Sequence, residues 1–144
     1  MRLNHVTAHD WQFLYDLLAE RPHQANISHR EMPDIATHVA FIKSNPYTAW
    51  YIIEVDHQHV TDDRIATIQL PAGAIYLSKQ DEIGVAIKRE HQGQHLDKQA
   101  IAQLMQRHVR PRYLANIAPD NMKSHKLFMG LGFKTIQNTL ELRP

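Results

Sequence analysis

Hydrophobic positions follow two different periods along this chain, and the change of period predicts where helices and strands lie. Between residues 11 and 18 apolar residues recur every three or four positions, which is the spacing of one helix face. Thr7 and Asp10 precede this run in the Ser/Thr-x-x-acid arrangement that caps a helix start. A second run of helical period covers residues 33 to 45, with Pro33 suited to its first position. We therefore expect two helices near the N-terminus.

Runs rich in β-branched and aromatic residues fill most of the remaining chain. Seven runs are expected to be strands: 2–6, 48–55, 64–70, 74–78, 82–88, 113–118 and 133–142. The polar residues 56–59 are expected to form a turn, and two more helices are expected at about 96–105 and 121–130. Helices and strands that alternate in one short chain predict a mixed α/β sandwich around a single sheet.

The composition narrows the class of protein. With 144 residues and 43% hydrophobic content, the chain matches one compact domain. It contains no cysteine, its first residues lack the apolar core of a signal peptide, and no apolar stretch approaches the roughly 20 residues of a membrane span. Basic and acidic residues nearly balance, with a net charge of +1, which is too little for a general attraction to nucleic acid. We expect a cytoplasmic protein that binds neither membrane nor nucleic acid.

The 11 histidines raise the question of a metal site. His57 and His59 would share one face of a strand, but they lie in the polar stretch DHQHVTDD and no third ligand follows at a recognisable spacing. A solvated hairpin end explains this stretch better, and we expect no metal.

Two segments of the chain carry a family resemblance. The first, VAIKREHQGQHLDKQAI (85–101), has the order strand, glycine-containing turn and helix, and the second, PDNMKSHKLFMGLGF (119–133), has the spacing Asn-x-x-Ser-x-x-Leu-Phe-x-x-x-Gly-Phe. Together they resemble the signatures of the GNAT superfamily of acyl-CoA N-acyltransferases. The second segment matches the family spacing throughout, whereas His95 and Asp97 stand in the first where the family prefers small residues.

The resemblance implies a fold and an activity. The fold is a mixed, mostly antiparallel central sheet flanked by about four helices, in a single domain over residues 1–144 with a protruding hairpin insertion at 61–72. The activity is transfer of an acetyl group from acetyl-CoA to a primary amine of a small molecule, an amino sugar or a protein N-terminus. The insertion could instead be the true third strand, or reach another subunit, so a homodimer stays open.

The resemblance also implies which residues bind coenzyme A. Successive N–H groups that enter a helix are unpaired, so the turn can hold a diphosphate without a cationic side chain. His95 could adopt the negative φ of a first helical turn, whereas the carboxylate of Asp97 would compete with phosphate unless it points away. The preceding strand would pair with the pantetheine arm. The expected contacts are Val85, Ala86, Ile87, Gln92, Gly93, Gln94, His95, Leu96, Asp97, Lys98, Asn121, Lys126 and Phe128.

Catalysis by this family needs a neutral amine, and an alkyl amine has a pKa near 10. Glu82 is the first candidate for the general base, because it begins the strand that would receive the coenzyme. Glu54 is a weaker alternative. Asn121 is a second catalytic candidate, as a contact to the coenzyme or to a water, although helix capping alone would also explain an asparagine there.

A proton must also reach the departing thiolate, and the family commonly places a tyrosine for this purpose where Phe128 stands. Tyr113 or Tyr76 could substitute, although each also suits an ordinary strand. Together with His95 and Asp97 in the turn, Phe128 leaves a second hypothesis open. In it, the chain is a regulatory module that binds coenzyme A but has lost turnover.

Overall fold

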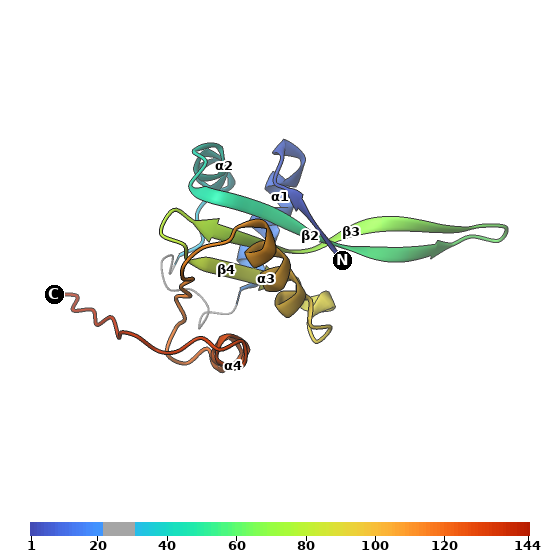
Figure 1. Cartoon of the computed structure of the whole chain (residues 1–144). Helices are drawn as coiled ribbons and strands as arrows, with labels where there is room; N and C mark the ends of the chain where they lie inside the picture. The colour runs from blue at the N-terminus through green and yellow to red at the C-terminus, as the bar shows by residue number, and fades with distance from the viewer. Residues whose placement is uncertain (22–30) are drawn as a thin grey trace.

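The structure of the chain, a computed structural model, describes residues 1–21 and 31–144. Four strands form one sheet in the order β1-β2-β3-β4, and each neighbouring pair is antiparallel (Figure 1). The elements in chain order are β1 (Arg2–His5), η1 (Ala8–Asp10), α1 (Trp11–Glu20), α2 (Ile35–Lys43), β2 (Tyr47–Val60), β3 (Ile65–Ser78), β4 (Ile83–Ile87), η3 (Arg89–His91), α3 (Leu96–Arg107) and α4 (Met122–Gly130). The predicted α/β class is confirmed. Among the described residues, no helix has the length and apolar content that a membrane crossing requires.

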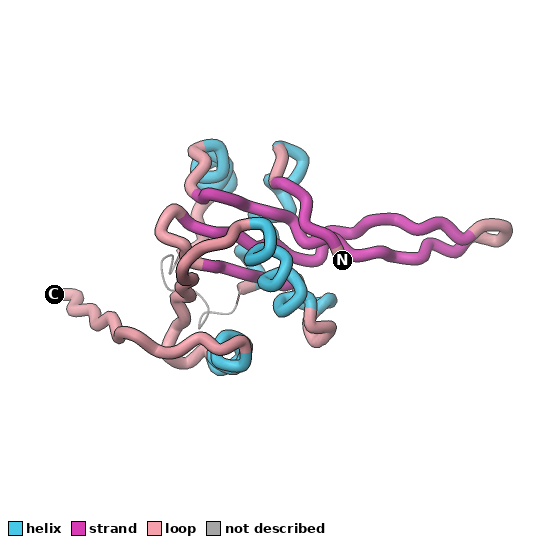
Figure 2. The backbone as a smooth tube through the Cα atoms, viewed as in Figure 1, coloured by secondary structure: helices cyan, strands magenta, loops and turns pink. Residues whose placement is uncertain are grey.

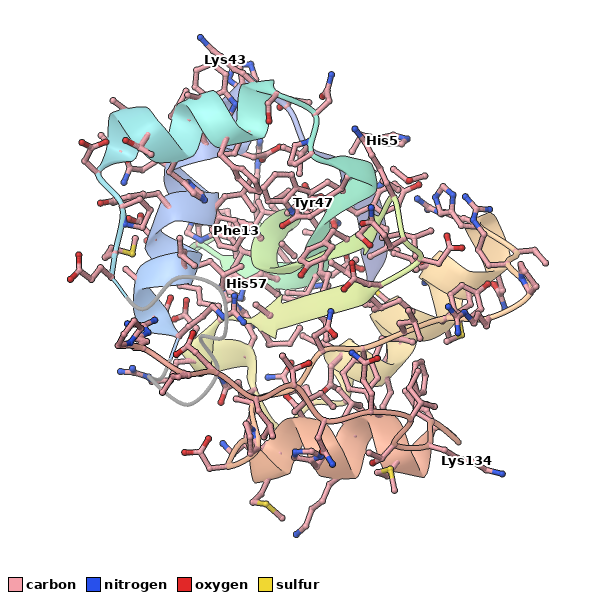
Figure 3. All side chains as sticks on the ribbon, turned by 90° about the vertical axis from the view of Figure 1, so that its left-hand side faces the viewer. His5, Phe13, Lys43, Tyr47, His57 and Lys134 are labelled. Carbon is pink, nitrogen blue, oxygen red and sulfur yellow. The ribbon has the colours of Figure 1, made fainter. Side chains whose placement is uncertain are left out.

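Helices cover both faces of the sheet, because its strands present apolar side chains alternately to each side. Ile53 and Ile75 belong to the larger core, which they share with α3 and α4. Ile52 and Ala74 belong to a smaller core, which they share with α1 and α2. Figure 3 shows α2 and α4 on opposite sides of the sheet.

The predicted helix starts are correct with one change. Thr7 and Asp10 form the expected capping box, in which Asp10 accepts the Thr7 N–H at 2.8 Å, and η1 leads directly into α1. The second helix begins two residues after Pro33 rather than at it. Asp34 occupies the cap and accepts the Thr37 N–H at 2.7 Å, so the first helical residue is Ile35.

The long hairpin of β2 and β3 differs from the sequence prediction. Residues 56–59 are not a turn, because β2 continues to Val60 and the turn lies between Thr61 and Arg64. The predicted break at residues 71–73 is a bulge within one continuous strand, β3, in which Ala72 is the extra residue. Residues 55–70 of β2 and β3 extend beyond the reach of β1 and β4, and we call this part of the hairpin the β-arm (Figures 1 and 2).

Two predicted strands are absent from the described structure. Segment 113–118 makes a single parallel bridge, between Leu114 and Glu82, and segment 133–142 forms no strand. Both segments have strand-like sequences, but a strand also needs a neighbouring edge with which to form hydrogen bonds. The local pattern predicts that these segments favour an extended conformation, but it does not show whether another strand lies beside them.

Candidate functional site

The open edge of β4 is the first part of the site. At its start the Ile83 N–H donates to the Leu114 carbonyl at 2.7 Å, and beyond this point no strand of the described residues lies beside β4 on that side. The Lys88 N–H points the other way and donates to the Ala72 carbonyl at 2.7 Å. Because backbone groups alternate along a strand, the N–H groups of Val85 and Ile87 face the open edge. An extended ligand could pair with them there.

The turn after β4 supplies a run of unpaired amides. Gly93 has φ +84° and His95 has φ +60°, so the backbone passes twice through the left-handed region before α3 begins at Leu96. No hydrogen bond joins any backbone N–H of residues 93–97 to another described residue. These five donors lie at a helix N-terminus, where the helix dipole favours negative charge. The arrangement therefore fits a diphosphate.

His95 does not have the backbone conformation that we expected for it. It is the N-cap of α3, with a positive φ, and not a residue of the first helical turn with a negative φ. The left-handed conformation carries a steric cost for a residue with a Cβ, although histidine is among the residues that tolerate it better. The family preference for a small residue at this position therefore has two causes. Glycine adopts the left-handed backbone without strain, and a small side chain leaves room for a ligand.

Asp97 lies where it competes for the helix N-terminus. Its Oδ1 accepts the backbone N–H of Lys98 at 2.8 Å, so the carboxylate does not point away from the turn. This bond occupies the N–H that follows the five donors of residues 93–97. The ammonium of Lys98 is exposed beside it.

Charged groups surround the turn. Lys88 and Glu90 form an ion pair at 2.7 Å, which raises the pKa of Lys88 and lowers the pKa of Glu90 through the hydrogen bond between them. Glu20, at the end of α1, accepts the Arg89 N–H at 3.1 Å. A hollow of about 350 Å³ lies among these four residues. Gln92 crosses the turn and donates from Nε2 to the Ile87 carbonyl at 3.1 Å.

Glu82 lies where β4 meets segment 113–118. Its carboxylate accepts a hydrogen bond from Ser78 Oγ at 3.0 Å and another from the amide of Asn116. Ser78 Oγ also accepts the Glu82 N–H at 3.0 Å, which closes the tight turn between β3 and β4. Neutral donors from two different segments thus hold the carboxylate beside the open edge.

Two tyrosines from neighbouring strands, Tyr47 of β2 and Tyr76 of β3, lie side by side on one face of the sheet. The rings of Tyr47 and Tyr76 stack in parallel with centroids 3.8 Å apart. Tyr76 is paired with Gly84 of β4, and its ring covers that glycine. Burial is the largest cause that raises the pKa of both phenols, and Glu82 contributes in the same direction. Both tyrosines therefore keep their protons at neutral pH.

Other predicted site residues lie in structural positions. Asn121 caps α4, with Oδ1 accepting the Ser124 N–H at 3.3 Å. Phe128 is buried in the larger core, with its ring 5.1 Å from that of Phe133, and Lys126 is exposed on α4. These contacts explain Asn121 and Phe128 without a coenzyme.

Two further catalytic candidates fit the site less well. Tyr113 already makes hydrogen bonds to its neighbours, and Glu54 lies away from the open edge of β4. The Tyr113 hydroxyl donates to the His108 carbonyl at 2.6 Å and accepts the Arg110 N–H at 3.1 Å. Glu54 belongs to β2, which β3 separates from β4. Tyr76 is thus the remaining candidate acid, and Glu82 the remaining candidate base.

The structure also adds residues that the sequence did not indicate. Ser78 stands four positions before Glu82 across a tight turn, a spacing that could have been noticed. Asn116 and Tyr47 reach the site only through the sheet and the bridge at Leu114, for which the sequence carries no local signal.

Another hollow and a pair of histidines lie away from β4 and the turn that follows it. The hollow, of about 330 Å³, lies between the end of β1, the start of α1 and the connection from α2 to β2. None of the residues predicted from the sequence lines it, but Tyr47 does. His57 and His59 lie on the β-arm opposite Ile68 and Ala66. Within residues 1–21 and 31–144, no three histidine, aspartate or glutamate side chains gather as metal ligands.

Comparisons with known proteins bear on the fold. No protein-family model matches the chain, and neither does any curated protein sequence. A domain from Methanocaldococcus jannaschii superposes with a TM-score of 0.74 at 20% identity, over 97% of this chain and 92% of that one. The aminoglycoside 6'-N-acetyltransferase from Acinetobacter haemolyticus superposes with a TM-score of 0.66 at 12% identity, over 100% of this chain and 98% of that one. The microcin C7 self-immunity acetyltransferase, solved with acetyl-CoA and AMP, superposes with a TM-score of 0.60 at 17% identity, over 91% of this chain and 77% of that one.

These similarities extend over nearly the whole chain, although identity is low. The chain therefore has the fold of the GNAT acetyltransferases.

Proposed function

We propose that the chain is an N-acetyltransferase that moves an acetyl group from acetyl-CoA to a primary amine of a small molecule, an amino sugar or a protein N-terminus. One observation carries this proposal. The open edge of β4 is followed, after η3, by a turn whose amides at 93–97 have no hydrogen bond to another described residue. The likeness to an acetyltransferase solved with acetyl-CoA supports the choice of donor.

The donor side of the site consists of backbone groups. The N–H groups of Val85 and Ile87 would pair with the pantetheine arm as with an added strand, and the amides at 93–97 would hold the diphosphate. A backbone N–H on the β4 edge would also donate to the thioester oxygen as negative charge develops there. Acetyl-CoA supplies the activated acyl group, and the chain supplies its position.

The acceptor side consists of Glu82 and the two tyrosines. Glu82 would take a proton from the substrate ammonium, directly or through a water, so that the amine can attack. The amine nitrogen then forms the new C–N bond as the C–S bond breaks. Tyr76 holds its phenolic proton close to Glu82 and is our candidate to protonate the departing thiolate; the second proton that the amine nitrogen loses as the amide forms restores the phenol. The products are an N-acetyl amine and free coenzyme A.

The proposal is tested by mass spectrometry of products formed from acetyl-CoA and a panel of amines. Thiol release should appear only with an amine that gains an acetyl group. Calorimetry should show that acetyl-CoA binds. If the wild-type chain does not bind acetyl-CoA, the proposal is wrong.

A second candidate function is a regulatory module that binds coenzyme A without turnover. The bond from Lys98 N–H to Asp97 favours it, because a carboxylate at the turn opposes phosphate binding. Phe128, buried in the core, also provides no hydroxyl. Binding without thiol release across the whole amine panel would favour this module over the enzyme.

A further inference from the structure

The hollow beside the start of α1 has the size of a small-molecule site. Its volume of about 330 Å³ lies at the lower end of the range that is typical of ligand pockets. It opens between the end of β1, the start of α1 and the connection from α2 to β2. None of the described residues that line it belongs to β4 or to the turn at 93–97. A ligand in this hollow would therefore lie apart from the proposed coenzyme site.

Aromatic rings line the hollow. The chain has two tryptophans, Trp11 at the start of α1 and Trp50 in β2, and both are lining residues. Each is half-buried, because it packs against the smaller core and remains partly open to solvent. A partly exposed indole ring offers a flat apolar face against which another planar ring can pack. The lining therefore favours a ligand with an aromatic group.

The charge of the hollow is positive. The ammonium of Lys43 lies over the ring of Trp11, 5.0 Å from its centroid, and no ion pair joins it to a carboxylate of the described chain. No aspartate or glutamate lines the hollow. Thr7 does, and its N–H and hydroxyl already hold the carboxylate of Asp10, at 2.8 and 3.3 Å. A cationic ligand would meet Lys43 without a compensating carboxylate, whereas an anion would gain an ion pair.

Neutral donors lie in the same lining. Asn45 follows α2 with φ +51°, a left-handed conformation that asparagine adopts more readily than most residues. Its side-chain amide makes no hydrogen bond to another described residue. The ring of His5 packs 4.8 Å from that of Tyr51, and its nitrogens likewise have no hydrogen bond within the described chain. The amide and the imidazole N–H can both donate to the oxygens of an acid.

We propose that this hollow binds a small planar aromatic anion, in which one ring system carries a carboxylate or a phosphate. The ring would pack against Trp11 and Trp50, and the acid would pair with Lys43. A neutral aromatic molecule would leave the ammonium without a counter-charge, and an inorganic anion would leave the indole faces uncovered. Both parts of the ligand are therefore needed for binding. The inference does not rest on the proposed acetyl transfer.

The first test uses the wild-type chain, because both of its tryptophans line the hollow and their two indole N–H signals report on it by NMR. The probes are benzoate and phenyl phosphate, with benzamide as the neutral analogue and inorganic phosphate as the analogue without a ring. At least one aromatic anion should shift both indole signals saturably and bind at least about tenfold more tightly than either analogue. The tighter of the two identifies the acid as a carboxylate or a phosphate. If neither anion shifts both signals, or if neither shows this preference, the proposal is wrong.

The second test removes the charge. Lys43→Gln should weaken binding of the preferred anion at least about tenfold and leave the affinity for benzamide unchanged. Lys134→Gln is the matched control and should bind as the wild type does, since Lys134 lies at the opposite end of the molecule from Lys43 (Figure 3). A Lys43→Gln chain that binds the anion as tightly as the wild type overturns the proposal.

A competition experiment separates this site from that of the coenzyme. Saturating acetyl-CoA should leave the affinity for the aromatic anion unchanged. Displacement of the anion would mean that the probe occupies the proposed coenzyme site, and it would overturn the inference. A chain that binds the anion in the hollow but transfers no acetyl group would uphold this inference and refute the proposed function.

Discussion

The ring of Tyr76 lies directly over Gly84 on the neighbouring strand, in the space that a side chain at Gly84 would occupy. A Cβ at this position would overlap the ring carbons and the hydroxyl of Tyr76. The missing side chain therefore lets Tyr76 lie flat between β4 and the ring of Tyr47. The glycine thus shapes the acceptor side of the site without contacting a ligand.

Gly84→Ala should displace Tyr76 and destabilise the fold by about 1 to 3 kcal/mol, the usual cost of overpacking. Thermal unfolding should show the loss, and the rate of acetyl transfer should fall with it. Gly130→Ala is the matched control, since a Cβ there meets nothing within 4 Å. Its melting temperature should stay level or rise. Equal losses in both variants would mean that the Tyr76 ring is not the cause.

Glu82→Gln should lower the turnover rate by about 100-fold or more, which is typical when a general base is lost. The amide keeps the size of the side chain and can still accept from Ser78. Steady-state kinetics with a productive amine would measure the effect, and calorimetry should show that acetyl-CoA still binds. Glu54→Gln changes a carboxylate two strands away and should have the wild-type rate. A Glu82→Gln enzyme with undiminished turnover would exclude Glu82 as the base.

The parts of this structure that the sequence predicts well are those in which the signal is local. The helix from Leu96 follows from apolar spacing after Gly93, and the helix predicted at about 121–130 follows from the segment that begins at Asn121; both are present, the second over Met122–Gly130. The position of Glu82 at the start of β4 follows from the strand pattern. Its partner Asn116 does not, because the two meet only through the bridge at Leu114.

The failures have one physical cause. Residues 56–59 are polar, and polarity predicts a turn, but β2 continues through them as one strand of a ribbon that projects into solvent. Residues 133–142 alternate like a strand, yet alternation does not say where the neighbouring edge lies. The left-handed backbone at His95 was missed for a similar reason, because histidine does not mark that conformation as glycine does. Each case depends on contacts or torsions beyond the local pattern.

The left-handed backbone of His95 leads to a stability prediction. His95→Gly should stabilise the chain by about 0.5 to 1 kcal/mol, because glycine adopts a positive φ without the Cβ penalty. His95→Val should have the opposite sign, since a branched Cβ tolerates this region least. Urea unfolding of the two variants and the wild type would measure the order. If valine is as stable as glycine, the turn does not hold φ at +60° in solution.

Asp97→Asn should tighten acetyl-CoA binding by about two- to fivefold, which corresponds to about 0.3 to 1 kcal/mol for one charge at a helix N-terminus. The amide oxygen can still accept the Lys98 N–H, so the turn keeps its shape. Calorimetry at low salt would show the change, and added salt should reduce it. Asp62→Asn, in the turn of the β-arm, removes the same charge far from α3 and should bind as the wild type does. Unchanged affinity in Asp97→Asn would mean that the diphosphate does not lie at this turn.

The contact between His108 and Tyr51 predicts how stability changes with pH. His108 Nε2 lies 2.7 Å from the Tyr51 hydroxyl. Burial, followed by the charges of Arg110, Arg107 and His5, lowers the pKa of His108 below its usual value of about 6.5. The unfolded chain therefore binds a proton at this residue more readily than the folded chain does.

From this sign it follows that the contribution of His108 to stability is complete above about pH 6.5 and is lost as the pH falls through the window below it. His108→Gln does not titrate, so its free energy of unfolding should fall less steeply between about pH 7 and pH 5 than that of the wild type. Urea unfolding at each pH would measure the two slopes. His59→Gln on the exposed β-arm is the matched control and should keep the wild-type slope. Should His108→Gln lose stability as steeply as the wild type, the acid sensitivity of the fold would have to come from a group other than the one against Tyr51.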